Sequence, residues 1–337
     1  MRAVVLVGGF GTRLRPLTQH RPKQMLPLLD RPMIEWVAEH LGRAGVDEIV
    51  LALGYKPEAF LDAYPEGTCA GVRMRYAVEP EPLGTAGAIR FAAAELGLDR
   101  GDEPFLVVNG DVITDLDIGE LVDLHRSSGA EGTIALSPVD DPSRYGVVPI
   151  DRDGRVEAFI EKPDASTAPS HWINAGTYVL EPALLARIPA DRAVSVERET
   201  FPAVVAEGGL YALESDAYWI DAGTPETYLR VQLDLAQRRT GPDASWIHPT
   251  ATVAPTAHVE RAVIGAGVVV ADGATVVRSV LGAGSRVGAG STVHRSVVGP
   301  AAIVGDGASV HGLSVLGDAV ELAPGAALRS ARLPDGE

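Results

Sequence analysis

A short aliphatic repeat in the last part of the chain most constrains how it can fold. From residue 246 onward, aliphatic residues recur every five or six positions, and Ile264, Leu281 and Val298 lie 17 residues apart, each followed by glycine. Three short sides of about six residues make one coil of a parallel β-helix, and each side turns one aliphatic side chain toward the axis. The spacing therefore predicts a hexapeptide-repeat β-helix over residues 246–337, with less regular capping coils at its ends.

Residues 1–240 show a different pattern, in which short β-branched runs alternate with helical stretches. Strands are expected at Ala3–Val7, Glu48–Leu53, Arg73–Ala77 and Phe105–Asn109, and helices at Met33–Leu41, Pro57–Ala63, Thr85–Leu96 and Thr224–Gln237. This alternation is typical of βαβ units on a mostly parallel sheet. Strands then come closer together, at Gly132–Leu136, Gly146–Ile150 and Val156–Ile160, so we expect the α/β sheet of this first domain to become mixed.

Charge and composition exclude several classes of function. The 337 residues contain 29 Lys and Arg against 45 Asp and Glu, a net charge of −16 that argues against a nucleic-acid partner or an anionic membrane surface. No apolar run approaches the roughly 20 residues that span a bilayer, so we expect a cytoplasmic protein without a membrane partner. The only lysines are Lys23, Lys56 and Lys162, and the other basic residues are arginines. Because a compact ammonium is not equivalent to a guanidinium, each lysine is a candidate functional residue.

Glycines and cations follow the first expected strand. Residues 8–18 read GGFGTRLRPLT. Glycines at the carboxyl end of a strand let backbone N–H groups approach a phosphate, and this end of an open α/β sheet is where ligands bind. Arg13, Arg15 and Lys23 lie within 11 positions of an otherwise acidic chain. The pattern matches neither the dinucleotide-binding nor the Walker motif, but it predicts an anionic ligand.

Two further strands end on a carboxylate. Asp111 closes the run VVNGD, and Asp221 closes the run YWID. Two carboxylates that converge on phosphate groups make an oxygen-ligand site for Mg²⁺, so the pair predicts this cofactor.

With PKQMLPL at residues 22–28, the first motif resembles the signature of the sugar-nucleotide pyrophosphorylases, nucleotidyltransferases that join an NTP to a sugar 1-phosphate and release pyrophosphate. The pattern is closest to the mannose-1-phosphate guanylyltransferase group, whose members often carry a C-terminal left-handed β-helix, so the resemblance covers essentially the whole chain. It implies a Rossmann-like mixed sheet, with Arg13 on the β- and γ-phosphates and Lys23 on the α-phosphate. Asp111 and Asp221 match the metal ligands.

The resemblance also assigns residues to each substrate. It implies that Arg13, Lys23, Asp111 and Lys162 are catalytic. The nucleotide would contact Gly8, Gly9, Gly11, Thr12, Arg13, Lys23, Glu79, Gly84 and Thr85. The sugar phosphate would contact Gly146, Glu161, Lys162 and Asn174. Glu161 and Asn174 suit sugar hydroxyls, because such groups accept and donate hydrogen bonds in fixed directions. Read alone, Thr85 is a helix N-cap and Glu161–Lys162 a surface ion pair.

The motifs favour GTP and mannose 1-phosphate as substrates. Residues 109–112, 195–202 and 221–224 resemble the guanylyl group, whereas Lys23-Gln24 resembles some thymidylyltransferases. A glucose-1-phosphate thymidylyl- or uridylyltransferase and a cyclitol-phosphate nucleotidyltransferase therefore stay open, as does a non-catalytic regulatory subunit that binds nucleotide sugars.

The β-helix is expected to serve assembly. Its candidates for acyl transfer, His248, His258, His294 and His311, lie in about five coils that leave little room for such a site. All phosphate, metal and sugar motifs come before residue 225, so we expect a homo-oligomer formed through the β-helix and no substrate contact from it.

Overall fold

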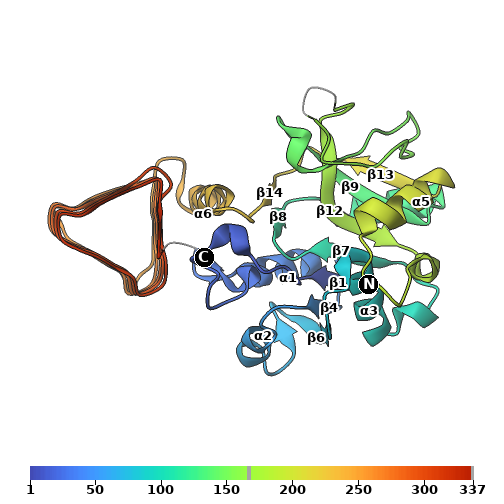
Figure 1. Cartoon of the computed structure of the whole chain (residues 1–337), viewed down its shortest axis with the longest axis horizontal. Coiled ribbons are helices and arrows are strands. Elements are labelled where there is room, and N and C mark those ends of the chain that lie inside the picture. The colour runs from blue at the N-terminus through green and yellow to red at the C-terminus, as the bar shows by residue number, and fades with distance from the viewer. Residues whose placement is uncertain (165–167, 335–337) are drawn as a thin grey trace. The chain divides into compact units, whose positions relative to one another are not determined.

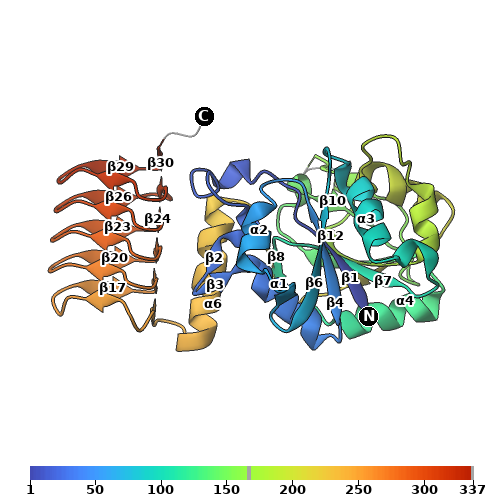
Figure 2. The ribbon, with the colours of Figure 1, turned by 90° about the horizontal axis from the view of Figure 1, so that it is seen from below.

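The computed structural model describes residues 1–164 and 168–334, so the end of the expected β-helix domain, residues 335–337, lies outside the described residues. By their contacts the residues form two compact units (Figures 1 and 2). The first unit comprises Met1–Gly9 and Ile34–Trp219, and the second comprises Phe10–Met33 and Ile220–Glu337.

A ten-stranded sheet forms the centre of the first unit. Its main path is β11-β10-β12-β7-β1-β4-β6-β5, and β9 pairs with both β12 and β13. The strands are β1 Arg2–Leu6, β4 Glu48–Leu53, β5 Thr68–Cys69, β6 Val72–Val78, β7 Phe105–Asn109, β9 Gly132–Pro138, β10 Gly146–Val147, β11 Ile160–Glu161, β12 Trp172–Leu180 and β13 Leu210–Glu214. Pairs β1–β4, β1–β7 and β4–β6 are parallel, whereas β12 runs antiparallel to β7 and β9. The sheet is mixed, as predicted.

Helices cover this sheet, and their apolar faces complete its core. They are α1 Met33–Arg43, α2 Glu58–Ala63, α3 Gly84–Glu95, α4 Ile118–Ser128 and α5 Phe201–Ala206, and a short strand β8, Val112–Thr114, follows β7. Every residue of β4 is buried, as a strand covered on both faces requires. The α3 helix packs on β1, β4 and β6 through small side chains, which lets it lie close to the strands.

The two strands expected at Gly146–Ile150 and Val156–Ile160 are shorter than predicted. Only Gly146–Val147 and Ile160–Glu161 are strands, and Ile150 and Val156 form an isolated bridge. Pro149 has no N–H to donate to a ladder. The Asp151 carboxylate accepts hydrogen bonds from the N–H groups of Asp153 and Arg155, which closes a turn at this point. Proline and turn chemistry therefore override the aliphatic pattern.

The β-helix of the second unit has the predicted three-sided coil (Figure 1), and its coils stack in Figure 2. All three of its sheets are parallel, in agreement with the left-handed β-helix that the resemblance implied. One contains β15 Trp246–Ile247, β18 Val263–Ile264, β21 Val280–Leu281, β24 Val297–Val298, β27 Val315–Leu316 and β30 Arg332–Leu333. The next contains β16 Thr252–Val253, β19 Val269–Val270, β22 Arg286–Val287, β25 Ile303–Val304 and β28 Glu321–Leu322. The third contains β17 His258–Glu260, β20 Thr275–Val277, β23 Thr292–His294, β26 Ser309–His311 and β29 Ala327–Arg329.

The aliphatic repeat forms the core of this β-helix. The buried column contains Ile264, Val270, Val276, Leu281, Val287, Val293, Val298, Val304, Val310 and Leu316. Each member of the column is at most 1% exposed, so the periodicity identified the interior side chains correctly.

The remaining elements of the second unit are a hairpin, a short strand and a long helix. Strands β2 (Pro27–Leu28) and β3 (Arg31–Pro32) form the hairpin, β14 (Trp219–Asp221) begins at the last residue of the first unit, and α6 spans Pro225–Thr240. Thr224 caps α6 in a capping box with Thr227. Among the described residues, no helix is both long and apolar enough to cross a membrane.

Hydrogen bonds from α6 hold the hairpin in place. The Tyr228 hydroxyl and the Gln232 amide both donate to the Pro27 carbonyl, at 2.6 and 2.7 Å, and Gln232 Oε1 accepts from the Leu29 N–H at 2.8 Å. Gln232 is 1% exposed, so water cannot take over the hydrogen bonds that its side chain makes to these backbone groups.

We predict that Gln232→Met destabilises the protein, because the buried N–H of Leu29 then loses its acceptor. The expected loss is about 1–3 kcal/mol in the free energy of unfolding, measured by urea titration. Gln237→Met, at an exposed position of the same helix, is the matched control and should change that free energy by less than about 0.5 kcal/mol. Equal effects of the two substitutions would contradict the role of Gln232.

Candidate active site

The signature segment of the second unit closes tightly on itself around Gly11. Gly11 has φ +63°, and a Cβ there would lie 3.0 Å from Thr18 Cγ2 and 3.3 Å from Lys23 Cβ. The Thr18 hydroxyl donates to the Gly11 carbonyl at 2.8 Å. Thr12 begins a 3₁₀ turn that ends at Leu14. Gly11 is therefore required both for its backbone conformation and for the close approach that brings Lys23 to this turn.

Arg13 and Asp221 face each other within the second unit. Arg13 Nη2 lies 3.8 Å from Asp221 Oδ2, and the side chains are 63% and 23% exposed. Asp221 Oδ1 accepts the Gly223 N–H at 2.8 Å, and a Cβ on Gly223 would come within 2.7 Å of both partners. The carboxylate is thus oriented by backbone, whereas the exposed guanidinium is free to turn toward an anion.

In the first unit, the predicted base-contact residues meet at the carboxyl ends of β1, β4 and β6. Gly8 and Gly9 follow β1, Gly54 follows β4, and Glu79 follows β6. A Cβ on Gly8 would lie 3.5 Å from Glu79 Oε1, and one on Gly54 would lie 3.4 Å from the Gly8 carbonyl oxygen. Glycines and one glutamate therefore follow three adjacent parallel strands at their carboxyl ends. This is the edge at which open α/β sheets bind ligands.

Burial raises the pKa of the Glu79 carboxyl above its usual value, while a hydrogen bond from the Leu83 N–H to Glu79 Oε2, 3.0 Å long, opposes that shift. This contact also fixes the loop that leads into α3. The carboxylate is held on one oxygen by the backbone.

Thr85 is not the N-cap of α3. The N-cap is Leu83, and Thr85 lies inside the helix. Its hydroxyl donates to Glu197 Oε2 at 2.7 Å and accepts from the Val196 N–H at 2.8 Å. A Cβ on Gly84, whose φ is +72°, would lie only 2.5 Å from the Val194 carbonyl oxygen.

The segment at residues 194–197 therefore builds the wall of this loop. Ser195 Oγ also donates to Glu197 Oε2, at 2.7 Å. Sequence reasoning singled out residues 195–202 only as a mark of the guanylyl group and assigned no contact to Glu197. Its pairing with Thr85, 112 positions away, carries no local signal.

Asp111 lies in the turn that follows β7, two positions after the last strand residue, Asn109. The Gly110 N–H donates to the Leu6 carbonyl at 2.9 Å, and a Cβ on Gly110 would lie 2.7 Å from Val7 Cγ1. Because β7 pairs in parallel with β1, this close approach places Asp111 at the same sheet edge as Gly8 and Gly9.

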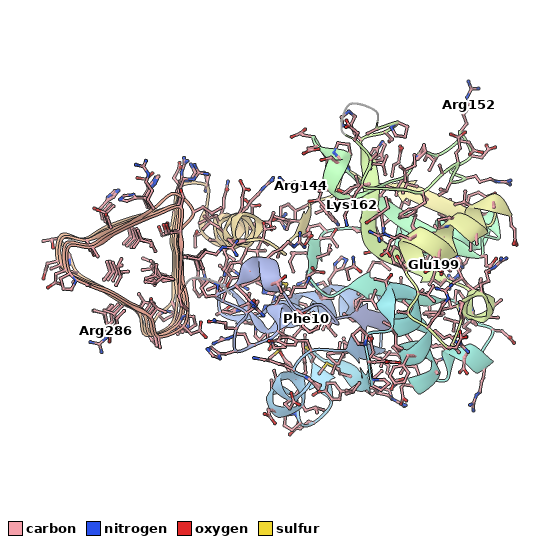
Figure 3. The ribbon with its side chains drawn as sticks, in the orientation of Figure 1. Phe10, Arg144, Arg152, Lys162, Glu199 and Arg286 are labelled. Carbon is pink, nitrogen blue, oxygen red and sulfur yellow. The ribbon has the colours of Figure 1, made fainter. Side chains whose placement is uncertain are left out.

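Three of the four predicted sugar-phosphate residues lie together. Gly146 pairs with Glu161 across β10 and β11, and Lys162 Nζ lies 3.0 Å from Glu161 Oε1. A Cβ on Gly146 would lie 2.7 Å from the Phe159 ring and 3.3 Å from Glu161 Oε2. Lys162 is 57% exposed (Figure 3), so its ammonium is accessible to a phosphate while its ion pair with Glu161 contributes little to stability.

Asn174 is partly engaged by its own strand. Its Nδ2 donates to the Tyr178 hydroxyl at 2.8 Å and its Oδ1 accepts the Gly176 N–H at 3.0 Å, at the irregular register of β12. One amide hydrogen and one lone pair remain for a ligand. Sequence reasoning also missed Trp219, whose indole N–H donates to the neighbouring carbonyl of Ala175 at 2.8 Å and whose ring meets that of Tyr145 edge-on.

Asp111 and Asp221 each supply a single carboxylate, each within its own unit. In residues 1–164 and 168–334, no group of three or more His, Cys, Asp or Glu side chains could hold a metal ion. Mg²⁺ in phosphoryl-transfer sites is commonly bound by one or two carboxylates together with water and substrate phosphates. Asp111 in the first unit and Asp221 in the second are donors of this kind.

Comparison with known proteins identifies the family of the chain. The Nucleotidyl transferase family matches residues 2–238. The chain belongs to this family. The GMPPB C-terminal domain family matches residues 242–334. The family membership inferred from the motifs is confirmed.

Curated relatives and solved structures in this family cover most of the chain. Mannose-1-phosphate guanylyltransferase of Mycobacterium tuberculosis is 40% identical over 80% of this chain and 76% of its own length. Mannose-1-phosphate guanylyltransferase 1 of Arabidopsis thaliana is 43% identical over 71% of this chain and 67% of its own.

Two structures resemble the chain over 69% of its length. HddC from Yersinia pseudotuberculosis complexed with GMP-PN is 32% identical, with a TM-score of 0.59 over 99% of that chain. A putative glucose-1-phosphate thymidylyltransferase from Bacillus anthracis in complex with a sucrose is 26% identical, with a TM-score of 0.61 over 94% of that chain.

Proposed function

We propose that the chain joins GTP to mannose 1-phosphate, forming GDP-mannose and releasing pyrophosphate. The observation that carries this proposal is the identity of 40% and 43% to mannose-1-phosphate guanylyltransferases from a bacterium and a plant. The glycines, cations and carboxylates described above support it, because they supply donors for both anionic reactants. A regulatory subunit without turnover would have no need for all of Arg13, Lys23 and Lys162.

In the proposed reaction, an oxygen of the sugar phosphate attacks the α-phosphorus of GTP. A new P–O bond forms, the bond between the α-phosphorus and the bridging oxygen to the β-phosphate breaks, and pyrophosphate leaves. Lys23 neutralises the α-phosphate, Arg13 the β- and γ-phosphates, and Lys162 the sugar phosphate. Because both reactants are anions, positioning and charge neutralisation account for most of the catalysis.

Asp111 and Asp221 would hold Mg²⁺, which when bound supplies further neutralisation of the phosphate charge. Arg13 then exchanges its contact with Asp221 for the nucleotide phosphates, since its side chain is exposed and only 3.8 Å from that carboxylate.

Glu79 is the residue proposed to favour guanine. A carboxylate accepts hydrogen bonds only, and the Watson–Crick edge of guanine offers two adjacent donors where thymine and uracil offer one. Gly8, Gly9, Gly84 and Thr85 would line the same pocket. Gly146, Glu161 and Asn174 would contact the sugar.

The exposed Ile247 and Val269, 44% and 38% accessible, support a homo-oligomer formed through the β-helix. The single cysteine, Cys69, is buried and has no second cysteine in the chain with which to form a disulfide, which supports a cytoplasmic protein. The family matches at residues 2–238 and 242–334 support domains at 1–240 and 246–337.

We predict that pyrophosphate release is fastest with GTP and mannose 1-phosphate. The assay combines ATP, GTP, UTP and dTTP with mannose 1-phosphate, glucose 1-phosphate and a cyclitol phosphate. Glu79→Gln replaces one acceptor oxygen by a donor, so the ratio of kcat/KM for GTP to that for dTTP should fall at least about tenfold. A wild-type preference for dTTP and glucose 1-phosphate would instead support the thymidylyltransferase alternative.

We predict that Asp111→Asn and Asp221→Asn each lower turnover at least about 100-fold with folding intact, because each removes a charge that would hold Mg²⁺. Turnover is measured over a Mg²⁺ titration, and circular dichroism checks the fold. Asp216→Asn, in the loop before β14, is the matched control and should leave turnover unchanged. Near-normal turnover of either aspartate variant at saturating Mg²⁺ would exclude the two-carboxylate site.

Lys162→Ala and Lys23→Ala should affect different substrates, because each ammonium faces the phosphate of a different reactant. Lys162→Ala should mainly raise the KM for the sugar phosphate, and Lys23→Ala should impair use of the nucleotide. Steady-state kinetics with each substrate varied in turn separates the two effects. Lys56→Ala is the control lysine. Equal effects of both variants on both substrates would contradict this division.

A further inference from the structure

Three arginines occupy equivalent corners of successive β-helix coils. Arg261, Arg278 and Arg295 are 17 residues apart, and each has a left-handed backbone, with φ of 46–47°. The Arg278 N–H donates to the Glu260 carbonyl and the Arg295 N–H to the Val277 carbonyl, both at 3.0 Å. The three side chains therefore form a column whose members are about 4.8 Å apart in backbone position. We call these three residues the arginine column.

The corner that carries the arginines differs from the other two corners in its side chains. The left-handed positions of the other two corners carry Gly267, Gly284, Ala301 and Ala319 on one and Gly273, Gly290, Gly307 and Gly325 on the other. A residue with a Cβ is disfavoured there, whereas glycine is not. The third corner carries Arg261, Arg278 and Arg295 and then Leu313 and Ser330, so its distinguishing feature is three arginines in successive coils.

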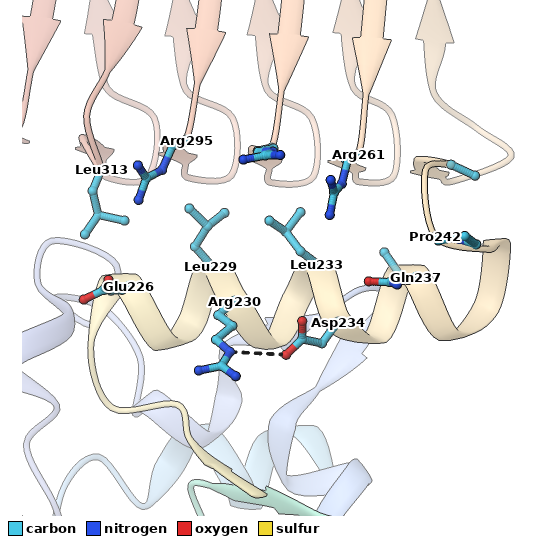
Figure 4. A pocket seen from close by; sticks show the side chains of 13 residues that line it. Glu226, Leu229, Arg230, Leu233, Asp234, Gln237, Pro242, Arg261, Arg295 and Leu313 are labelled. Atoms are coloured by element: carbon cyan, nitrogen blue, oxygen red, sulfur yellow. Dashed lines mark ion pairs between the residues drawn. The ribbon is translucent and has the colours of Figure 1, made fainter. Parts of the chain in front are cut away.

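The arginine column lines a cavity against α6. The cavity has a volume of about 330 Å³, within the range of small-molecule sites. Figure 4 shows Leu229 and Leu233 pointing from α6 toward the coils, and Arg261 and Arg295 pointing from the coils toward α6. The leucines present an apolar wall opposite three cations.

The charges of the column are not neutralised by the protein. None of the three guanidinium groups makes an ion pair or a side-chain hydrogen bond with any residue in 1–164 or 168–334. Two carboxylates line the cavity, but Asp234 pairs with Arg230 at 3.7 Å and Glu226 lies at the Leu313 end of α6 (Figure 4). Glu260, next to Arg261, contacts His258 at 3.2 Å. In a chain with net charge −16, the column is an island of uncompensated positive charge.

We propose that the arginine column binds a linear di- or triphosphate group in this cavity. Guanidinium groups recognise phosphate through paired hydrogen bonds, and the leucine wall lowers the local dielectric and strengthens those contacts. From Arg261 to Arg295 the backbone positions span about 10 Å, which suits linked phosphates better than a single phosphate ion. The phosphates come either free or on a nucleoside. The site contains no residue assigned to the catalytic reaction.

Chemical protection tests the site on the unaltered protein. Phenylglyoxal modifies accessible arginines, and peptide mass spectrometry reports the rate at each position. Inorganic tripolyphosphate should slow the modification of Arg278 at least about fivefold, because bidentate contacts cover the guanidinium. Arg286 on β22, exposed and outside the cavity (Figure 3), is the internal control. Unchanged reactivity of Arg278, or equal protection of Arg286, would overturn the proposal.

Calorimetry then measures affinity without turnover, in full-length protein carrying Lys23→Ala to weaken phosphate binding at the catalytic site. Arg278→Gln should weaken tripolyphosphate binding at least about tenfold, Arg278→Lys less so because it keeps the charge, and Arg286→Gln not at all. Tighter binding of GTP than of tripolyphosphate assigns the site to nucleotides, and equal binding assigns it to the phosphate chain alone. Orthophosphate binding as tightly as tripolyphosphate would overturn it. None of these readouts depends on the proposed reaction.

Discussion

The hydrogen bonds from α6 to the backbone of Pro27 and Leu29 determine where the signature segment lies. Tyr228 and Gln232 saturate one carbonyl and one N–H that are otherwise buried. Burial raises the pKa of the Tyr228 hydroxyl, which keeps it protonated and able to donate. The segment that carries Gly11, Arg13 and Lys23 is therefore fixed by a helix about 200 residues later in the chain, and not by local sequence preference alone.

The last coils of the β-helix hold the same segment. Arg21 pairs with Asp318, the Arg332 guanidinium donates to the Arg15 carbonyl at 3.1 Å, and a Cβ on Gly317 would lie 3.0 Å from Pro16 Cβ. The sequence places every phosphate, metal and sugar motif before residue 225, which led to the expectation that the β-helix serves only assembly. These contacts give it a second role, because they support the backbone that carries Arg13 and Lys23, the cations proposed to bind the nucleotide.

Periodic and local features were predictable from the sequence, and long-range contacts were not. The column from Ile264 to Leu316 follows from spacing alone, because one aliphatic side chain per side must fill the axis. The alternation of strands and helices up to β7 follows from the same kind of pattern. Strands β10 and β11 are shorter than predicted because of Pro149 and the Asp151 turn. The aliphatic run favours a strand and these residues favour a turn, and the pattern alone does not say which preference is stronger. The pairing of Thr85 with Glu197 joins residues that no motif relates.

Glycine has two distinct uses in this chain. Some glycines shape the loops beside predicted ligand-binding residues, and others only turn the coils of the β-helix. At Gly11 and Gly84 it allows a left-handed backbone and a close approach beside predicted ligand-binding residues, where a Cβ would meet Thr18 Cγ2 at 3.0 Å and the Val194 carbonyl oxygen at 2.5 Å. At Gly267 and Gly284 it only turns a coil, since a Cβ would meet nothing within 4 Å. Arg278 occupies a corner of the same left-handed kind. Arg278 makes no ion pair with any residue in 1–164 or 168–334, and it lines the cavity against α6 in which we propose that an anion binds.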